Sequence, residues 1–286
     1  MKPGPFAYHK AESVNDAIRL LAEHGEEASI LAGGQSLIAN LNQRRVSPRL
    51  LIDVGGLGDL RQIEMTNNIL RIGAGVRHAE LGDSELVAQH APLLIEAVRH
   101  LGHTAVRNRG TIGGNIVYAD PASELPACCM AADATFELAG PAGRREVSAR
   151  TFFTGAFETT KNADELLTEI RMPVELESTR TCFREFARRR GGYALLGVAI
   201  YSEWTEQQIS SLSPVFFGLG GAPQLASDAA ALLTNVQVSD EAISAAADAL
   251  GNELETVTDA QAGAAYRMHL AQHYFAEGLR GLRDGA

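Results

Sequence analysis

Cysteine is scarce in this sequence. The 286 residues contain three cysteines, Cys128, Cys129 and Cys182, and none belongs to a C-x-x-C pair. Three cysteines at these spacings cannot build a disulfide framework, and they do not match the ligand patterns of zinc or iron–sulfur sites. No other set of histidine and carboxylate side chains has metal-ligand spacing. We therefore expect the cysteines to be small buried residues, and we expect no metal site in this chain.

The sequence also lacks an excess of positive charge and any long apolar run. It has 25 Lys and Arg against 35 Asp and Glu, and the net charge of −10 argues against nucleic acid as a partner. No stretch reaches the ~20 apolar residues of a membrane span, and residues 1–5 carry no apolar signal region. We expect a cytoplasmic protein with no membrane span. The one basic run, Arg188–Arg190, is either a solvated strand end or a docking patch.

Two common nucleotide-binding signatures are absent. A P-loop requires G-x-x-x-x-G-K-[ST], and no Gly-Lys-Ser or Gly-Lys-Thr occurs in the sequence. A dinucleotide-binding Rossmann turn requires G-x-G-x-x-G, but Gly73-Ala74-Gly75 is followed by Val76-Arg77-His78 and lacks the third glycine. Neither kind of nucleotide site is therefore predicted.

Two short glycine pairs are the most informative features that are present: Ala32-Gly33-Gly34-Gln35-Ser36-Leu37 and Thr111-Ile112-Gly113-Gly114-Asn115. Glycine lets the main chain approach an anion closely and reach positive φ, and successive N–H groups form a partly positive nest. Neither glycine core contains Lys or Arg, so the loops suit a diphosphate held permanently in a cofactor better than a triphosphate cleaved at magnesium. The alternative is turn and helix-cap chemistry, which Thr and Asn also favour.

These loops, the run Gly102–Gly110 before the second loop, and the segment Asp120–Pro126 together resemble the FAD-binding medium subunit of molybdenum hydroxylases. That family includes the medium chain of carbon monoxide dehydrogenase and the flavin region of xanthine dehydrogenase. The resemblance extends from Phe6–His9 to Ala265–Leu270. It implies an α+β fold, with a two-part FAD-binding domain of the PCMH (vanillyl-alcohol-oxidase-like) type followed by a C-terminal three-stranded antiparallel sheet with helices.

The resemblance also implies which residues bind FAD. The hydroxyl groups of Ser36 and Thr111, the amide of Asn115 and the glycine N–H groups would satisfy the diphosphate. Glu124 takes the place of a family Asp that reaches the adenosine ribose. Tyr193 takes the place of an aromatic residue near the isoalloxazine ring, although the acidic residue before it is missing here and the alternative is half-buried packing. The candidate cofactor-binding residues are Ala32, Gly33, Gly34, Gln35, Ser36, Leu37, Thr111, Ile112, Gly113, Gly114, Asn115, Glu124 and Tyr193.

The organisation of the chain follows from its local patterns. We expect an FAD-binding domain over 1–175, with parts 1–56 and 57–175 on either side of the cofactor, and a C-terminal domain over 176–286. Ser13 should cap a helix that Gly25 ends, and His78 and His103 should be structural residues. We expect strands at 28–32, 49–54, 69–74, 181–189, 194–204 and 209–221, and helices at 13–22, 79–88, 91–100, 240–250 and 259–283.

The expected function is that of an FAD-binding electron-transfer subunit with no catalytic residue of its own. The resemblance implies a small partner subunit with two [2Fe–2S] clusters, a large partner subunit with the molybdenum cofactor, and a dimer of heterotrimers. Because this chain has no cluster ligands, electrons that reach its FAD must come from another polypeptide. Two alternatives stay open: a self-sufficient FAD-dependent oxidase or reductase of the same fold, and a non-catalytic scaffold without cofactor.

Overall fold

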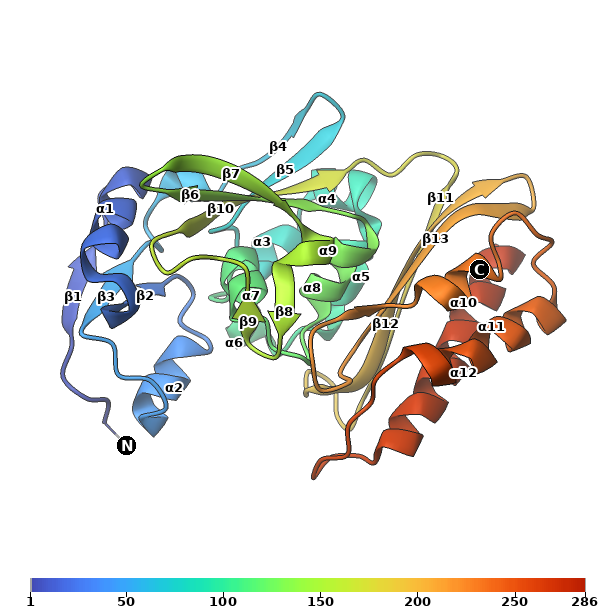
Figure 1. Ribbon diagram of the computed structural model, residues 1–286. Coiled ribbons are helices and arrows are strands. Elements are labelled where there is room, and N and C mark those ends of the chain that lie inside the picture. The colour runs from blue at the N-terminus through green and yellow to red at the C-terminus, as the bar shows by residue number, and fades with distance from the viewer. Residues whose placement is uncertain (1, 286) are drawn as a thin grey trace.

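The computed structural model describes residues 2–285, which form three units in a row (Figure 1). The N-terminal unit has a three-stranded sheet, the middle unit a five-stranded sheet surrounded by helices, and the C-terminal unit a four-stranded sheet with helices. The first and last units lie at opposite ends of the molecule, on either side of the middle unit.

The N-terminal unit has parallel strands in the order β1-β3-β2. Its first helix begins at the predicted cap, because Ser13 Oγ accepts a hydrogen bond from the Asp16 N–H at 3.1 Å, and it ends at Gly25, which has a φ of +50°. The second strand leads directly into the first glycine loop. The elements are β1 (Ala7–Lys10), α1 (Val14–His24), the 3-10 helix η1 (Gly25–Glu27), β2 (Ala28–Leu31), α2 (Leu37–Gln43), β3 (Leu50–Asp53) and the 3-10 helix η2 (Gly58–Leu60).

The middle unit has an antiparallel sheet in the order β4-β5-β10-β6-β7, and a separate two-stranded pair, β8 and β9. Its helices include α7, which begins within the second glycine loop. The elements are β4 (Ile63–Thr66), β5 (Ile69–Gly73), α3 (His78–Gly82), α4 (Glu85–His90), α5 (Pro92–His100), α6 (Thr104–Arg107), α7 (Ile112–Tyr118), α8 (Glu124–Ala131), β6 (Thr135–Gly140), β7 (Gly143–Ser148), α9 (Ala149–Phe152), β8 (Phe153–Gly155), β9 (Glu158–Thr159) and β10 (Leu166–Pro173).

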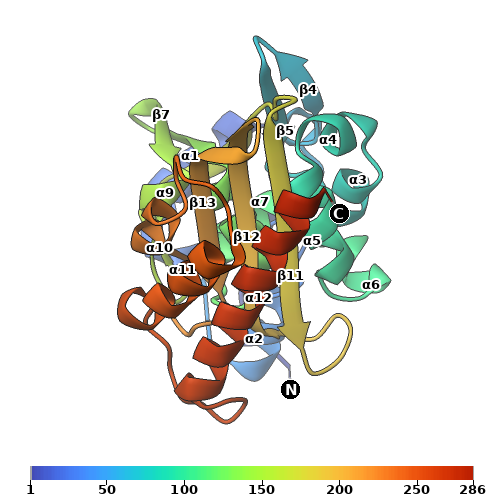
Figure 2. The same cartoon turned by 90° about the vertical axis from the view of Figure 1, so that its right-hand side faces the viewer.

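The C-terminal unit contains the three predicted antiparallel strands, and a short fourth strand extends the sheet. Helices α11 and α12 cross one face of the sheet (Figure 2), and the last helix begins at residue 264 rather than at the expected 259. The elements are β11 (Thr179–Ala187), β12 (Ala194–Thr205), β13 (Gln208–Phe217), β14 (Gln224–Leu225), α10 (Ser227–Ala231), α11 (Asp240–Glu253) and α12 (Ala264–Asp284).

The other face of the C-terminal sheet packs on the middle unit. The rings of Phe183 and Phe217 stack with their centroids 5.7 Å apart, in the same core as the apolar side chains of α8. Polar contacts also cross this contact region. Glu96 Oε2 accepts a hydrogen bond from the Phe183 N–H at 3.0 Å, the Gly218 N–H donates to Pro121 O at 2.7 Å, and Arg150 Nη2 donates to Ser213 Oγ at 3.0 Å. The C-terminal unit is therefore joined directly to the turn that follows α7.

Candidate cofactor-binding site

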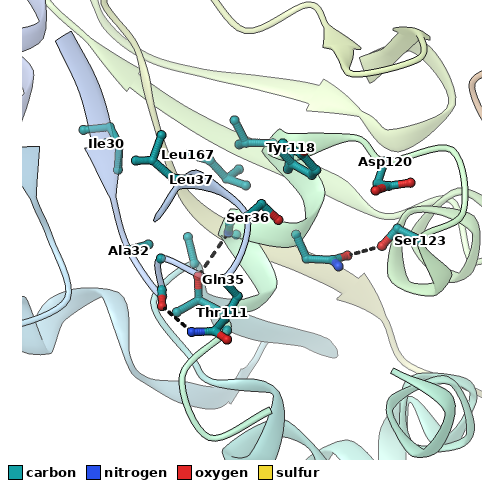
Figure 3. A pocket seen from close by; sticks show the side chains of 18 of the residues that line it. Ile30, Ala32, Gln35, Ser36, Leu37, Thr111, Tyr118, Asp120, Ser123 and Leu167 are labelled. Carbon is teal, nitrogen blue, oxygen red and sulfur yellow. Dashed lines mark hydrogen bonds between the residues drawn. The ribbon is translucent and has the colours of Figure 1, made fainter. Parts of the chain in front are cut away.

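A cavity of about 670 Å³ lies where the three units meet, and both glycine loops line it (Figure 3). This volume is within the ~300–1,000 Å³ range of small-molecule and cofactor sites. The structure brings all the predicted site residues to the cavity except Ile112. Ile112 is fully buried in the core of the middle unit, so its side chain is a packing residue.

The first glycine loop presents a run of unused hydrogen-bond donors. Within residues 2–285, the backbone N–H groups from Gly33 to Leu37 have no protein acceptor. The Gln35 side chain folds back, and its Nε2 donates to Gly33 O at 3.1 Å. Gly34 has a φ of +70°, a conformation that side chains other than glycine rarely adopt. The Ser36 hydroxyl precedes α2 without capping it. Its free N–H groups form a concave set of donors of the kind that suits an anion, and the loop has no cationic side chain.

The two glycine loops converge because glycines let their backbones approach closely. A Cβ on Gly33 would overlap the backbone carbonyl of Arg109, just before the second loop. A Cβ on Gly113 would come within 2.5 Å of Ala74 Cβ and 2.6 Å of Ala74 O. Gly33 and Gly113 are therefore required by packing between chain segments, whatever the cavity holds.

The second glycine loop uses its own N–H groups, which corrects the expectation that Gly113 and Gly114 donate to a diphosphate. Gly113 N donates to Ala74 O at 2.9 Å, and Gly114 N donates to the Thr111 hydroxyl at 3.1 Å. Asn115 N bonds to Thr111 O at 3.0 Å. The cap chemistry considered for Thr111 is confirmed, since Thr111 is the N-cap of α7. This loop offers the cavity side chains rather than backbone donors.

The Asn115 side chain is oriented by a neighbour. Its Oδ1 accepts a hydrogen bond from Ser123 Oγ at 2.8 Å, which leaves the amide NH2 group of this cavity-lining residue as a free donor. Tyr118 and Asp120 also line the cavity although neither was predicted. Tyr118 OH accepts from Asn40 Nδ2 at 3.2 Å, and this link from α7 to α2 spans 78 residues of sequence. Asp120 lies within the segment that carried the family resemblance, so that motif was the available signal.

Glu124 is buried at the start of α8, on the cavity wall. Burial, followed by the proximity of Glu185, raises the pKa of Glu124 to about 8. Burial also raises the pKa of Asp120, whose Oδ1 accepts from Ala122 N at 3.0 Å. At neutral pH Glu124 therefore carries its proton and can donate a hydrogen bond as well as accept one.

Tyr193 lies at the mouth of the cavity and is 74% exposed, which disfavours half-buried packing as its role. The turn before it is held in place because Gly191 has a φ of +68° and a Cβ there would lie 2.8 Å from Gly102 O. Burial of its hydroxyl end raises the pKa of Tyr193. Arg189, from the basic run, also lines the cavity.

His78 behaves differently from a satisfied structural histidine. It is 3% exposed and lines the cavity, but neither ring nitrogen has a hydrogen-bond partner among residues 2–285. Burial, which outweighs a small opposing effect of the nearby Thr111 main chain, lowers the pKa of His78 to about 4. His103, by contrast, is exposed and does not line the cavity.

The donor set fits a cofactor with a central diphosphate and apolar ends. Free N–H and hydroxyl groups gather at the first glycine loop, while apolar side chains line the cavity on both sides of it. These are Ile30, Leu166 and Leu167 toward the N-terminal unit and Leu101 and Val106 near the Gly102 contact with Gly191. The residues present therefore fit an extended dinucleotide such as FAD.

Two features are absent from residues 2–285: a cluster of metal ligands, and a helix long and apolar enough to cross a membrane. In this part of the chain no group of three or more histidine, cysteine or carboxylate side chains could hold a metal ion, and the three cysteines are free and buried.

Comparisons with known proteins define the class. Residues 4–175 match the family described as the FAD binding domain in molybdopterin dehydrogenase, and residues 181–282 match the CO dehydrogenase flavoprotein C-terminal domain. The nicotine 6-hydroxylase medium subunit of Paenarthrobacter nicotinovorans is 34% identical over 95% of both chains. The carbon monoxide dehydrogenase medium chain of Hydrogenophaga pseudoflava is 33% identical over 95% of this chain and 94% of that one.

A solved structure of carbon monoxide dehydrogenase from Hydrogenophaga pseudoflava superposes with a TM-score of 0.96 at 34% identity, covering 99% of this chain and 98% of the other. The predicted α+β fold, with its FAD-binding domain followed by a C-terminal sheet, is thereby confirmed. The chain belongs to the FAD-binding medium subunits of molybdenum hydroxylases, and it is an oxidoreductase flavoprotein of that family.

Proposed function

We propose that this chain carries FAD as the electron-transfer subunit of a heterotrimeric molybdenum hydroxylase and is active only within that complex. The observation that carries the proposal is the row of free backbone N–H groups from Gly33 to Leu37, in a cavity of about 670 Å³. Unpaired donors beside a cavity require a ligand or water. A diphosphate can accept from several neighbouring N–H groups at once.

The chain's own residues would hold and orient the cofactor. The Gly33–Leu37 N–H groups and the Ser36 hydroxyl bind the diphosphate, and the Asn115 amide donates from the opposite loop. Neutral Glu124 supplies a further donor, and Tyr193 covers part of the cavity mouth. FAD supplies the exchange of one or two electrons, and the protein sets its position and surroundings. We propose the division into domains at 1–175 and 176–286, with the cofactor between parts 1–56 and 57–175.

Electron entry is assigned to partner subunits. In this proposal a large subunit with the molybdenum cofactor would oxidise the substrate, and a small subunit with two [2Fe–2S] clusters would relay the electrons. The residues of this chain would hold the FAD that supplies electron transfer to an external acceptor. The assembly is a dimer of heterotrimers. The medium-chain and medium-subunit names of the relatives support such partners.

The test is anaerobic mixing of the purified, FAD-loaded chain with N-heterocycles or aldehydes while flavin absorbance is followed. We expect bound flavin that dithionite bleaches, and no bleaching by an organic compound until both partner subunits are added. Rapid bleaching by an organic substrate with this chain alone would favour the self-sufficient oxidase. A purified chain that takes up no FAD would favour the scaffold without cofactor.

A further inference from the structure

His78 is an unusual residue for a protein interior. Buried polar groups are almost always hydrogen-bonded, and an unsatisfied one costs about 1–3 kcal/mol. Both nitrogens of His78 are buried without a partner among residues 2–285. The Thr111 main chain lies close enough to the ring to raise the pKa of His78, but its contact does not meet the geometry of a hydrogen bond, and Arg107 acts on the ring through its charge alone.

The chain nevertheless fixes His78 firmly in place. Its N–H donates to Gly110 O at 3.0 Å, and the preceding Arg77 forms a β-bridge with Thr111. The imidazole lies against Gly110, where a Cβ would come within 2.9 Å of both Cε1 and Nδ1 of the ring. Gly110 does not have a positive φ, so its backbone conformation does not require glycine. The lack of a side chain is what leaves space for the imidazole. The ring is thus held beside the second glycine loop.

The protonation state of the ring is defined. With a pKa of about 4, His78 is neutral at neutral pH, so it carries one N–H donor and one acceptor nitrogen. The ring forms part of the cavity wall. A 180° turn of an imidazole exchanges its carbon and nitrogen positions with little change in shape, so either edge can face the cavity. Both nitrogens are buried in the present orientation, so this turn is what would bring one of them to a group bound in the cavity.

We propose that His78 is a cofactor-binding residue: one of its ring nitrogens forms a hydrogen bond with the FAD that occupies the cavity. This inference rests on the proposed function, because it requires FAD to be the ligand. It explains why an unpartnered imidazole is kept at this wall, since the cofactor supplies the partner that the protein lacks. His78 therefore has opposite effects on two measurable quantities. It lowers the stability of the apoprotein, and it raises the affinity for FAD.

The test compares His78→Leu with the unmodified chain, with His273→Leu as a matched control on the exposed face of α12, where the His273 side chain is 60% exposed. We expect the His78→Leu apoprotein to melt at the same or a higher temperature, because no internal hydrogen bond is lost. Its dissociation constant for FAD, from titration of apoprotein, should rise about tenfold. His78→Gln, which keeps a donor and an acceptor, should restore part of the affinity. The control should change neither quantity.

A second readout follows the ring itself. In protein labelled with ¹⁵N at histidine, the imidazole signals of His78 are those that disappear in the His78→Gln variant. We expect these signals to shift when FAD is added. An unmodified affinity for FAD in His78→Leu, or imidazole signals that FAD leaves unchanged, would overturn the inference while leaving the proposed function standing. Failure of the unmodified chain to bind FAD would overturn both. If His78→Leu does not fold, Gly110→Ala provides the same test, because its methyl group would displace the ring and should lower the affinity.

Discussion

Ser36→Ala isolates the contribution of the first glycine loop to cofactor binding. The Ser36 hydroxyl lines the cavity and makes no hydrogen bond within residues 2–285, although the residue stands at the N-cap position of α2. Its removal should therefore change the free energy of unfolding of the apoprotein by no more than about 0.5 kcal/mol. A hydrogen bond to a charged group contributes about 1.5–3 kcal/mol. Its loss should raise the dissociation constant for FAD roughly ten- to hundredfold.

Thr111→Val is the informative comparison, because the Thr111 hydroxyl already accepts the Gly114 N–H at 3.1 Å. Loss of a capping side chain costs about 0.5–2 kcal/mol, so this variant should lower the stability of the apoprotein as well as the affinity. The assays are denaturant unfolding of each apoprotein and titration with FAD. An unchanged dissociation constant in Ser36→Ala would refute the placement of the diphosphate at this loop. An unstable Ser36→Ala apoprotein would show that the hydroxyl has a structural role.

Four further substitutions test the remaining features of the site. Gly34→Val and Gly114→Val should abolish stoichiometric FAD binding, measured as flavin released on heating. The first substitution places a branched side chain at a φ of +70°. The second places a Cβ 2.9 Å from the Thr111 hydroxyl oxygen. Tyr193→Ala should alter flavin fluorescence and the rate of reoxidation while FAD content stays nearly constant; loss of solubility with unaltered flavin properties would favour a packing role. Glu124 has a folded pKa of about 8, above its ordinary value, so the folded state binds the proton more tightly and stability falls as pH rises from about 4.5 to 8. Glu124→Gln should therefore unfold like the unmodified apoprotein at pH 4 and be more stable at pH 9, by up to roughly 5 kcal/mol; parallel pH profiles would contradict this.

Local signals predicted the strands β2, β3, β5, β11, β12 and β13 and the helices α1, α5, α11 and α12. The cap at Ser13 and the stop at Gly25 bound α1 as expected, because capping and positive φ are decided by neighbouring residues. The other four strands of the middle sheet, β6, β7, β10 and β4, were missed. Strand β4 carries a local signal. It pairs with β5 through a tight turn in which Asn67 and Asn68 have φ values of +51° and +60°. A pair of asparagines is a recognisable hairpin signal, so this strand could have been found from the sequence.

The chemistry of the second glycine loop could not be predicted in the same way. Thr111 accepts two of its N–H groups locally, but those of Ile112 and Gly113 donate to the main-chain oxygens of Val76 and Ala74, which lie nearly forty residues earlier in the chain. Such a pairing depends on how β5 packs against α7, and no local pattern specifies it. The two glycine pairs therefore look alike in sequence and differ in role: the first leaves its donors free, and the second uses them to join two segments. The unsatisfied state of His78 was hidden for the same reason, since it reflects the absence of distant partners.

The placement of the cavity couples the cofactor to the packing of the C-terminal unit. The turn before Tyr193 rests on Gly102, and the Gly218 N–H donates to Pro121 O at 2.7 Å, beside Asp120 on the cavity wall. A ligand that contacts both the middle unit and this turn binds only when the two units are packed together. Since a ligand that binds only the packed state stabilises it, bound FAD should strengthen the contact between the units as well as fill the cavity. The free donors of the first loop and the ring of His78 also gain hydrogen-bond partners only in the loaded protein. Bound FAD therefore stabilises the folded chain through these groups as well.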